Sequence, residues 1–273
     1  ESRGRPTRFL VYTEQAVAPQ GFISLAPGSY AIETTQDTTH VSVRSGGAEV
    51  TGQTGAPVAL QPAERAEVSL GQAARGPFPA KRNILVNSDF QNVETATPLS
   101  NGILAEGWQV TSEQGGDGGN VDGVVEVEHL GTSRALHFLR QGSGQNHGQT
   151  DVIQVTNQRV ADYLSLTLRF DVRLLYQELS GGGLQSSEFP LIVRVDYRDG
   201  TGTTRTWTKG FYYQNEANYN IVDGEMIPRD STYRFEVDLK EVLLDPQLIH
   251  NIRFYASGWD WDVYVSEVEL IGE

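Results

Sequence analysis

The sequence predicts an all-β protein built from two antiparallel β domains. Glycine is frequent among the 273 residues, with 29 Gly beside 11 Pro, and this composition is typical of short strands joined by many turns. Apolar residues alternate with polar ones in one segment after another, which indicates strands with one buried face. Only residues 236–244 are predicted to form a helix, and Asp245-Pro246 marks its end.

The distribution of charge divides the chain near residue 76. Residues 1–82 hold 8 basic and 7 acidic side chains, whereas residues 83–273 hold 13 basic and 28 acidic ones. Two prolines and a glycine lie close together in 76–79, which is typical of an extended linker. We therefore predict a first domain over residues 1–76, a Pro-rich linker over 77–82 and a second domain over 83–273.

The first domain shows short runs with a period of two. Val41 and Val43 alternate with polar neighbours, and Gly46-Gly47 then turns the chain into residues 48–50. The same alternation returns at 58–60 and at 66–70. These runs predict short strands of a small β domain.

The segments 28–34, 39–50 and 58–68 together resemble the FecR-like domain in their succession of strands and turns. Pro62-Ala63 departs from the pattern, because the family has a glycine turn at that place. The resemblance implies an extracytoplasmic sensory or interaction module of bacterial envelope proteins. It implies no catalytic residues.

The second domain has a longer series of landmarks. Its opening, Asn83-Ile84-Leu85-Val86-Asn87-Ser88-Asp89-Phe90-Gln91, is followed by Gly107-Trp108, by residues 134–138 and 163–170, and by the closing run 261–270. In this order they resemble the β-jelly-roll modules of the carbohydrate-binding and galactose-binding-like kind, over essentially all of 83–273. The resemblance implies an antiparallel β-sandwich, so the predicted fold is a small FecR-like β domain plus a jelly roll.

The residue pattern of the second domain also predicts a sandwich without the resemblance. Apolar residues occupy every second position from Leu164 to Tyr176, and the odd-numbered residues from Ser165 to Arg173 between them are polar. Residues 191–197 repeat the alternation, and Asp199-Gly200-Thr201-Gly202 provides a hairpin turn after them. Long half-exposed strands of this kind are typical of antiparallel sandwiches.

A metal site is implied only by the resemblance. Jelly-roll modules of this kind often hold a structural calcium ion between the opening and closing strands, where Asp89 and Glu267 lie in this sequence. Gln91 and Ser266 stand where the family has acidic residues, and losing two carboxylates removes much of the attraction for a divalent ion. We therefore expect no cofactor, with calcium at Asp89 and Glu267 as the alternative.

Aromatic and charged side chains make carbohydrate binding the leading hypothesis. Sugars present apolar faces flanked by hydroxyl groups, so proteins hold them with flat rings and bidentate polar groups. The candidate ligand-binding residues are Trp207, Tyr212, Trp259, Trp261, Arg173 and Arg194. The polar residues within 169–173 and within 194–198 are interpreted as the floor of a ligand-binding site, formed by two neighbouring strands. Packing of the rings against the core and cross-strand salt bridges are the alternatives.

Several function classes are excluded by composition and motifs. A net charge of −14 disfavours nucleic acid as a partner, because phosphate binding needs Lys and Arg. The chain has no cysteine, no Gly-x-Ser-x-Gly elbow and no His-Glu-x-x-His pair. Its longest apolar runs are only a few residues, far short of the roughly 20 that cross a membrane.

We therefore predict a non-catalytic, extracytoplasmic binding protein of the bacterial envelope that recognises a glycan through its second domain. An anchor upstream of Glu1 would tie it to the membrane. One alternative is a structural or protein-interaction module that binds an envelope protein and no sugar. The other is a FecR-type sensor domain of a transmembrane anti-sigma system, which follows only from the FecR-like resemblance.

Overall fold

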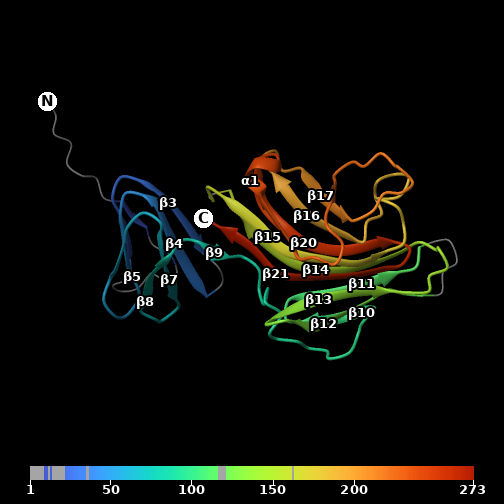
Figure 1. The fold of residues 1–273 in the computed structure, drawn as a ribbon. Coiled ribbons are helices and arrows are strands. Elements are labelled where there is room, and N and C mark those ends of the chain that lie inside the picture. Colours follow the sequence, from blue (N-terminus) through green and yellow to red (C-terminus); the bar gives the residue numbers. More distant parts are fainter. Residues whose placement is uncertain (1–8, 12, 14–21, 35–36, 116–120, 162) are drawn as a thin grey trace. The chain divides into compact units, whose positions relative to one another are not determined.

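The computed structural model describes residues 9–11, 13, 22–34, 37–115, 121–161 and 163–273. Strands dominate the described residues, which hold β1 to β21 and the four-residue helix α1 (Figure 1). This confirms the predicted all-β class. The chain divides into two compact units, residues Glu1–Arg82 with Gly272–Glu273, and residues Asn83–Ile271. No described helix is long and apolar enough to span a membrane.

The first unit is a small sandwich of two four-stranded sheets. One sheet has the order β1 (Phe9–Val11), β2 (Phe22–Leu25), β5 (Ala48–Thr51) and β6 (Val58–Leu60). The other has the order β3 (Ser29–Thr34), β4 (Thr38–Ser45), β7 (Glu64–Ser69) and β8 (Ala74–Pro79). Apolar side chains from both sheets form one core: Ile23, Val41, Val50, Leu60 and Val68 are fully buried.

Most of the expected linker belongs to this sandwich. Residues 77–79 lie in β8, where Phe78 is paired with Arg65 and Pro79 with Glu64. A proline has no N–H group to donate to a ladder, and β8 tolerates two because it is the edge strand of its sheet. The pattern of prolines therefore marks an edge strand rather than a free linker.

The second unit is a larger sandwich. Its seven-stranded sheet has the order β10 (Asn101–Ala105), β11 (Trp108–Glu113), β14 (Gly148–Arg159), β20 (Pro246–Gly258), β16 (Leu191–Asp199), β17 (Thr204–Tyr212) and β18 (Gly224–Met226). The facing six-stranded sheet has the order β12 (Val124–Leu130), β13 (Ser133–Arg140), β21 (Trp261–Gly272), β15 (Leu166–Gln177) and β19 (Tyr233–Asp238), with β9 (Arg82–Asn83) also paired to β21. In the seven-stranded sheet, the ladders from β10 to β17 are antiparallel, and β17 pairs with β18 in parallel.

The core of the second unit lies between the two sheets and follows the predicted alternation. In β15, Leu166, Leu168, Phe170, Val172 and Leu174 are all fully buried, whereas the residues between them face outward. Both ends of the predicted alternation differ, because Leu164 precedes the strand and is 71% exposed, and Tyr176 is 42% exposed.

The predicted helix is much shorter than expected. Residues 233–238 form β19, which pairs with β15, so the chain is held in a sheet over the first part of the expected helix. Helix α1 spans only Leu239–Val242, and the Asp238 side chain caps it by accepting a hydrogen bond from the backbone N–H of Lys240.

We expect residues 83–273 to fold without the first unit, because they hold a separate core. Lys81 lies between β8 and β9 with its side chain 60% exposed, so limited trypsin digestion should cut after it. The fragment that remains should unfold in one cooperative transition with an unchanged midpoint. Resistance to cleavage, or a fragment that is unfolded, would show that the two units depend on one another.

Candidate functional site

The outer face of the seven-stranded sheet carries a polar surface that extends over four neighbouring strands. Because side chains alternate across a strand, the residues between the buried apolar ones face outward. Strand pairing aligns them in three rows across β14, β20, β16 and β17. The rows are Asp151–Tyr255–Ile192–Gly210, Ile153–Arg253–Arg194–Thr208 and Val155–Asn251–Asp196–Thr206.

Two arginines face each other at the centre of this surface. Arg253 and Arg194 are direct partners in the ladder between β20 and β16, and each has a carboxylate partner of its own. Arg194 Nε donates to Asp196 Oδ1 at 2.9 Å, and Arg253 Nη1 donates to Asp151 Oδ1 at 3.3 Å. The two like charges are therefore neutralised locally, and the arginine side chains stay partly exposed, at 36% and 27%.

Asp196 and its neighbours are held in a fixed arrangement. Burial alone would raise the pKa of Asp196, but hydrogen bonds from Thr206 and Arg194 outweigh it and lower the pKa below its usual value. Thr206 Oγ1 donates to Asp196 Oδ1 at 2.7 Å. The carboxylate is consequently ionised at neutral pH and orients both donors.

Asp151 and Tyr255 form the buried side of the surface. Asp151 is 5% exposed, and burial raises its pKa, although hydrogen bonds from Gln149 and Arg253 oppose that shift. Burial likewise raises the pKa of the half-buried Tyr255. Tyr255 lies directly opposite Ile192 in the ladder, and because Ile192 is 3% exposed, the half-buried Tyr255 ring supplies most of the apolar patch beside the arginines.

A depression of about 320 Å³ lies over this patch. Its floor includes Tyr255, Ile192 and Thr208, and its walls come from the loop before β16 and the loop before β18. The two loops are joined, because Ser186 Oγ accepts from the backbone N–H of Val222 at 2.7 Å and donates to its carbonyl at 2.9 Å. The depression therefore has a fixed wall.

Phe189 anchors the wall to the sheet. A Cβ atom on Gly182, Gly210 or Gly224 would lie within 2.8 Å of the Phe189 ring, so these glycines make room for it. The Phe189 ring also lies 5.9 Å from that of Tyr212. Glycine is thus required at position 210 because the Phe189 side chain lies against the backbone of β17 there.

Two of the six predicted ligand residues lie at this surface. Arg194 is at its centre, and Tyr212 is half-buried beside Phe189, on the outward side of β17. Trp259 lies in the connection between β20 and β21 and is half-buried. The structure thus brings Arg194 and Tyr212 to one side of one sheet.

Trp207 and Trp261 face the core instead. Trp207 is paired with the buried Val195 and packs, half-buried, against the core of the sandwich. Its polar neighbours point to the opposite side of the strand, so their polarity does not indicate whether the Trp207 ring is buried or exposed. Trp261 is 1% exposed and lies 5.3 Å from the guanidinium of Arg140, so its ring is inaccessible to a ligand.

The predicted ligand floor is not a single surface. Arg173 lies on β15 of the six-stranded sheet and Arg194 on β16 of the seven-stranded sheet, so the two face away from each other across the sandwich. The loop between β15 and β16 carries the chain from one sheet to the other, which the alternation within each strand does not reveal.

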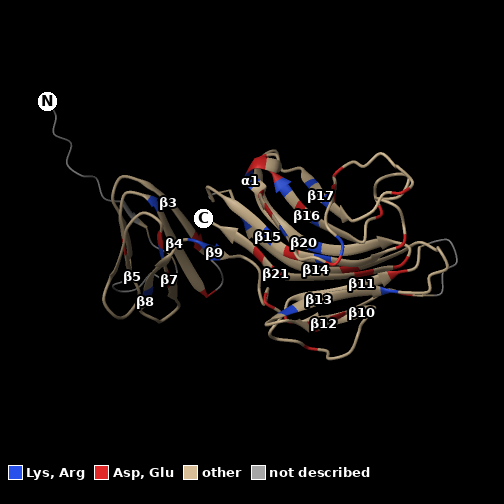
Figure 2. Cartoon of the chain, viewed as in Figure 1, with Lys and Arg blue, Asp and Glu red and all other residues tan. Residues whose placement is uncertain are grey.

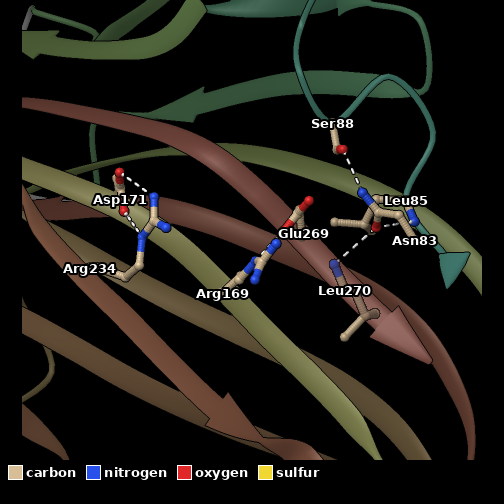
Figure 3. Close-up of polar contacts among 8 residues, drawn as sticks. All are labelled: Asn83, Leu85, Ser88, Arg169, Asp171, Arg234, Glu269 and Leu270. Carbon is tan, nitrogen blue, oxygen red and sulfur yellow. Dashed lines mark hydrogen bonds and ion pairs between the residues drawn. The ribbon is translucent and has the colours of Figure 1, made fainter. Parts of the chain in front are cut away.

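The residues on β15 are occupied by ion pairs, as the alternative interpretation supposed. Arg234 donates two hydrogen bonds to Asp171, at 2.6 and 2.8 Å, and Arg169 pairs with Glu269 (Figure 3). Arg173 donates to Asp230 at 2.6 and 3.0 Å. Such cross-strand pairs are typical of a solvated sheet face.

Asp89 and Glu267, the residues implied for calcium, line the same small depression. Glu267 accepts a hydrogen bond from Ser133 Oγ at 2.5 Å, and Asp89 accepts one from the backbone N–H of Gln91. Arg134 lines the depression too, and its positive charge opposes a divalent ion. Calcium at this place stays the untested alternative to the expectation of no cofactor.

Sequence reasoning missed Arg253, Tyr255 and Asp151. All three lie on strands that also carry buried apolar residues: Ile252, Phe254 and Ala256 flank Arg253 and Tyr255 on β20, and Val152 follows Asp151 on β14. The alternation in the sequence could therefore have identified these residues as outward-facing. What the sequence lacks is the strand order, which brings β14, β20 and β16 together although they are far apart along the chain.

No family model and no curated protein match the chain, so the FecR-like resemblance of residues 28–68 stays a prediction. Solved structures do match. A family 11 carbohydrate-binding module from Clostridium thermocellum, in complex with a β-1,3-1,4-mixed-linked tetrasaccharide, is 13% identical over 70% of this chain and 95% of that one, with a TM-score of 0.40.

Another neighbour comes from a study of promiscuous specificity among carbohydrate-binding modules of the β-sandwich superfamily. It is 15% identical over 99% of both chains, with a TM-score of 0.36. The enzymatically active domain of tailspike protein 4 from bacteriophage CBA120 is 7% identical over 70% of this chain and 21% of that one, with a TM-score of 0.38.

Proposed function

We propose that the chain binds a neutral glycan on the outer face of the seven-stranded sheet, over Tyr255 and Ile192. The observation that carries this proposal is the pair of facing arginines, each neutralised by its own carboxylate, beside a half-buried tyrosine. Charged donors and acceptors thus lie next to an apolar patch. The two arginines and their two carboxylates together carry no net charge.

This combination suits a sugar for chemical reasons. A pyranose ring offers an apolar face of C–H groups that packs on an aromatic ring, and its hydroxyl groups both donate and accept. Arg194 and Arg253 supply donors, and Asp196 supplies an acceptor that its neighbours keep ionised. Because each guanidinium already has a carboxylate partner, an anionic ligand would gain little from it.

The proposal extends to the role of the protein as a whole. We propose that this glycan binding takes place at the cell envelope or outside the cell. Residues 1–82 would then connect the binding unit to an envelope partner. Both statements depend on the glycan ligand and are tested with it.

The test is affinity electrophoresis of the full chain through gels that contain soluble polysaccharides, one neutral or anionic polymer per gel. We expect retardation by a neutral polymer. Tyr255→Ala and Arg194→Ala should each weaken that binding by about tenfold or more, which corresponds to about 1.4 kcal/mol. The midpoint of thermal unfolding should change little, because both side chains are partly exposed at the surface.

Arg173→Ala is the matched control, because it removes an arginine that also pairs with a carboxylate but lies on the opposite sheet. It should leave binding unchanged. Equal losses in Arg173→Ala and Arg194→Ala would place the ligand elsewhere. A chain that binds no polysaccharide in any gel would contradict the proposal and favour a protein partner.

A further inference from the structure

Three strands of the six-stranded sheet bring ionisable side chains together on its outer face. β13 lies between β12 and β21, and the ladders place His137 opposite Glu126 on one side and opposite Tyr264 on the other. The alternate residues Leu136 and Phe138 are fully buried in the core, so His137 points to the outer face. This cluster is on the other sheet from the proposed glycan surface.

His137 is 8% exposed although it lies on an outer face. Its Nε2 atom is 2.9 Å from Asp262 Oδ1, and because a carboxylate accepts hydrogen bonds, Nε2 carries a proton and donates it. The other nitrogen, Nδ1, is buried and makes no hydrogen bond within the described part of the chain. In the neutral ring, Nδ1 is therefore a buried lone pair without a partner.

Two carboxylates face this lone pair. Glu128 Oε1 lies 3.3 Å from Nδ1 and Glu126 Oε1 lies 4.0 Å from it. The three potential ligand atoms are all within 4.8 Å of one another, so they could close around one metal ion after small rotations of the two glutamate side chains. Burial and the negative charge of Glu128 raise the pKa of Glu126.

The surroundings fix the orientation of the three groups. The His137 ring stacks on that of Tyr264, with centroids 4.2 Å apart and planes inclined by 8°. The Tyr264 hydroxyl donates to Glu128 Oε2 at 2.8 Å, which leaves Oε1 of the same carboxylate directed at His137. A histidine that binds a metal usually donates a hydrogen bond from its other ring nitrogen to a carboxylate. That hydrogen bond fixes the tautomer and the ring plane of the histidine.

We propose that His137, Glu126 and Glu128 bind a divalent transition-metal ion of the zinc type, with Asp262 and Tyr264 as the positioning residues behind them. The imidazole nitrogen selects zinc over calcium, because calcium takes six to eight oxygen ligands. A dipositive ion would also remove the repulsion between the two glutamates. The remaining coordination positions would be open to water.

A proton is the competitor for the same lone pair. Burial lowers the pKa of His137, but Asp262 and Glu128 outweigh burial and raise it, so the protonated ring is stabilised by the same carboxylates. The metal should therefore be offered at about pH 8, above the ordinary range of histidine.

The test is titration calorimetry of the full, tag-free chain with zinc chloride at that pH. We expect one zinc ion per chain with saturable binding, and no displacement by millimolar calcium. X-ray absorption at the zinc edge should show one nitrogen and further oxygen ligands at about 2.0–2.2 Å. His137→Ala should abolish this site, and Asp262→Asn should weaken it by about 10–100-fold.

His129→Ala is the matched control, because His129 is an exposed histidine on β12, next to Glu128. It should bind zinc like the parent chain. Glu126→Gln preserves the shape of the side chain and covers the case in which His137→Ala does not fold. The proposal is overturned if the parent chain takes up no zinc, or if Glu126→Gln and His137→Ala, folded by circular dichroism, bind it unchanged.

Discussion

Replacement of Arg140 by methionine is expected to lower the free energy of unfolding of the second unit by about 3–5 kcal/mol. Arg140 ends β13 and is 1% exposed. Its guanidinium donates hydrogen bonds to five backbone carbonyls, those of Val121, Asn146, His147, Gly258 and Trp259, at 2.8–3.3 Å. Methionine fills part of the volume but leaves these buried acceptors without donors.

Thermal unfolding followed by circular dichroism measures this effect. For a unit of this size, each kcal/mol lowers the midpoint by about 2–4 °C, so a shift of about 6–20 °C is expected. Arg198→Met is the control, because Arg198 is exposed on the outer face of β16 and should change stability by less than about 0.5 kcal/mol. Equal shifts in the two variants would show that the carbonyls find other donors.

A second variant probes the same guanidinium from the backbone side. A Cβ atom on Gly148 would lie 2.4 Å from Arg140 Cζ, so alanine at this position would displace the guanidinium from its acceptors. The glycine at the start of β14 is therefore explained by one buried arginine. Arginine is rarely fully buried, so its position in the sequence gives no sign that Arg140 lies in the interior.

The fold class could be predicted from the sequence because a period of two is a local property. In β15 the alternation identified the buried residues from Leu166 to Leu174 correctly. Leu164 has the same parity but precedes the strand and is exposed, because the ladder and not the pattern decides where pairing begins. The helix over 236–244 was wrong over its first residues for the same reason, since pairing with β15 holds 233–238 in a strand.

The candidate surface could be predicted only in part. Arg194 and Asp196 were recognisable as outward-facing residues of one strand, but their neighbours Arg253 and Tyr255 come from a strand more than 50 residues later. Assigning Arg173 to the same floor was wrong because consecutive strands were assumed to be neighbours in one sheet. Charged residues of both signs lie on strands of both sheets (Figure 2), so the positions of charges along the sequence do not identify the strands that share a sheet.

Replacement of Phe170 by alanine is expected to lower the free energy of unfolding of the second unit by about 3–5 kcal/mol. Phe170 is fully buried on β15 and contacts rings from both sheets of the sandwich. Its ring centroid lies 5.6 Å from that of Phe211 and 5.0 Å from that of Phe254, both in the facing sheet, and 5.3 Å from that of Phe235 in its own. Alanine would leave a cavity lined by three rings, and sheets fixed by their ladders cannot close it.

Leu164→Ala is the informative comparison for this prediction, because the sequence alternation ranks Leu164 and Phe170 alike. Leu164 is 71% exposed, so its truncation should change stability by less than about 0.5 kcal/mol. Urea unfolding of both variants at the same temperature gives the two differences in free energy directly. A small loss in Phe170→Ala with an unchanged slope would mean that the facing sheets repack around the missing ring. A large loss in Leu164→Ala would mean that the Leu164 side chain packs against the core of the second unit, as the alternation predicts.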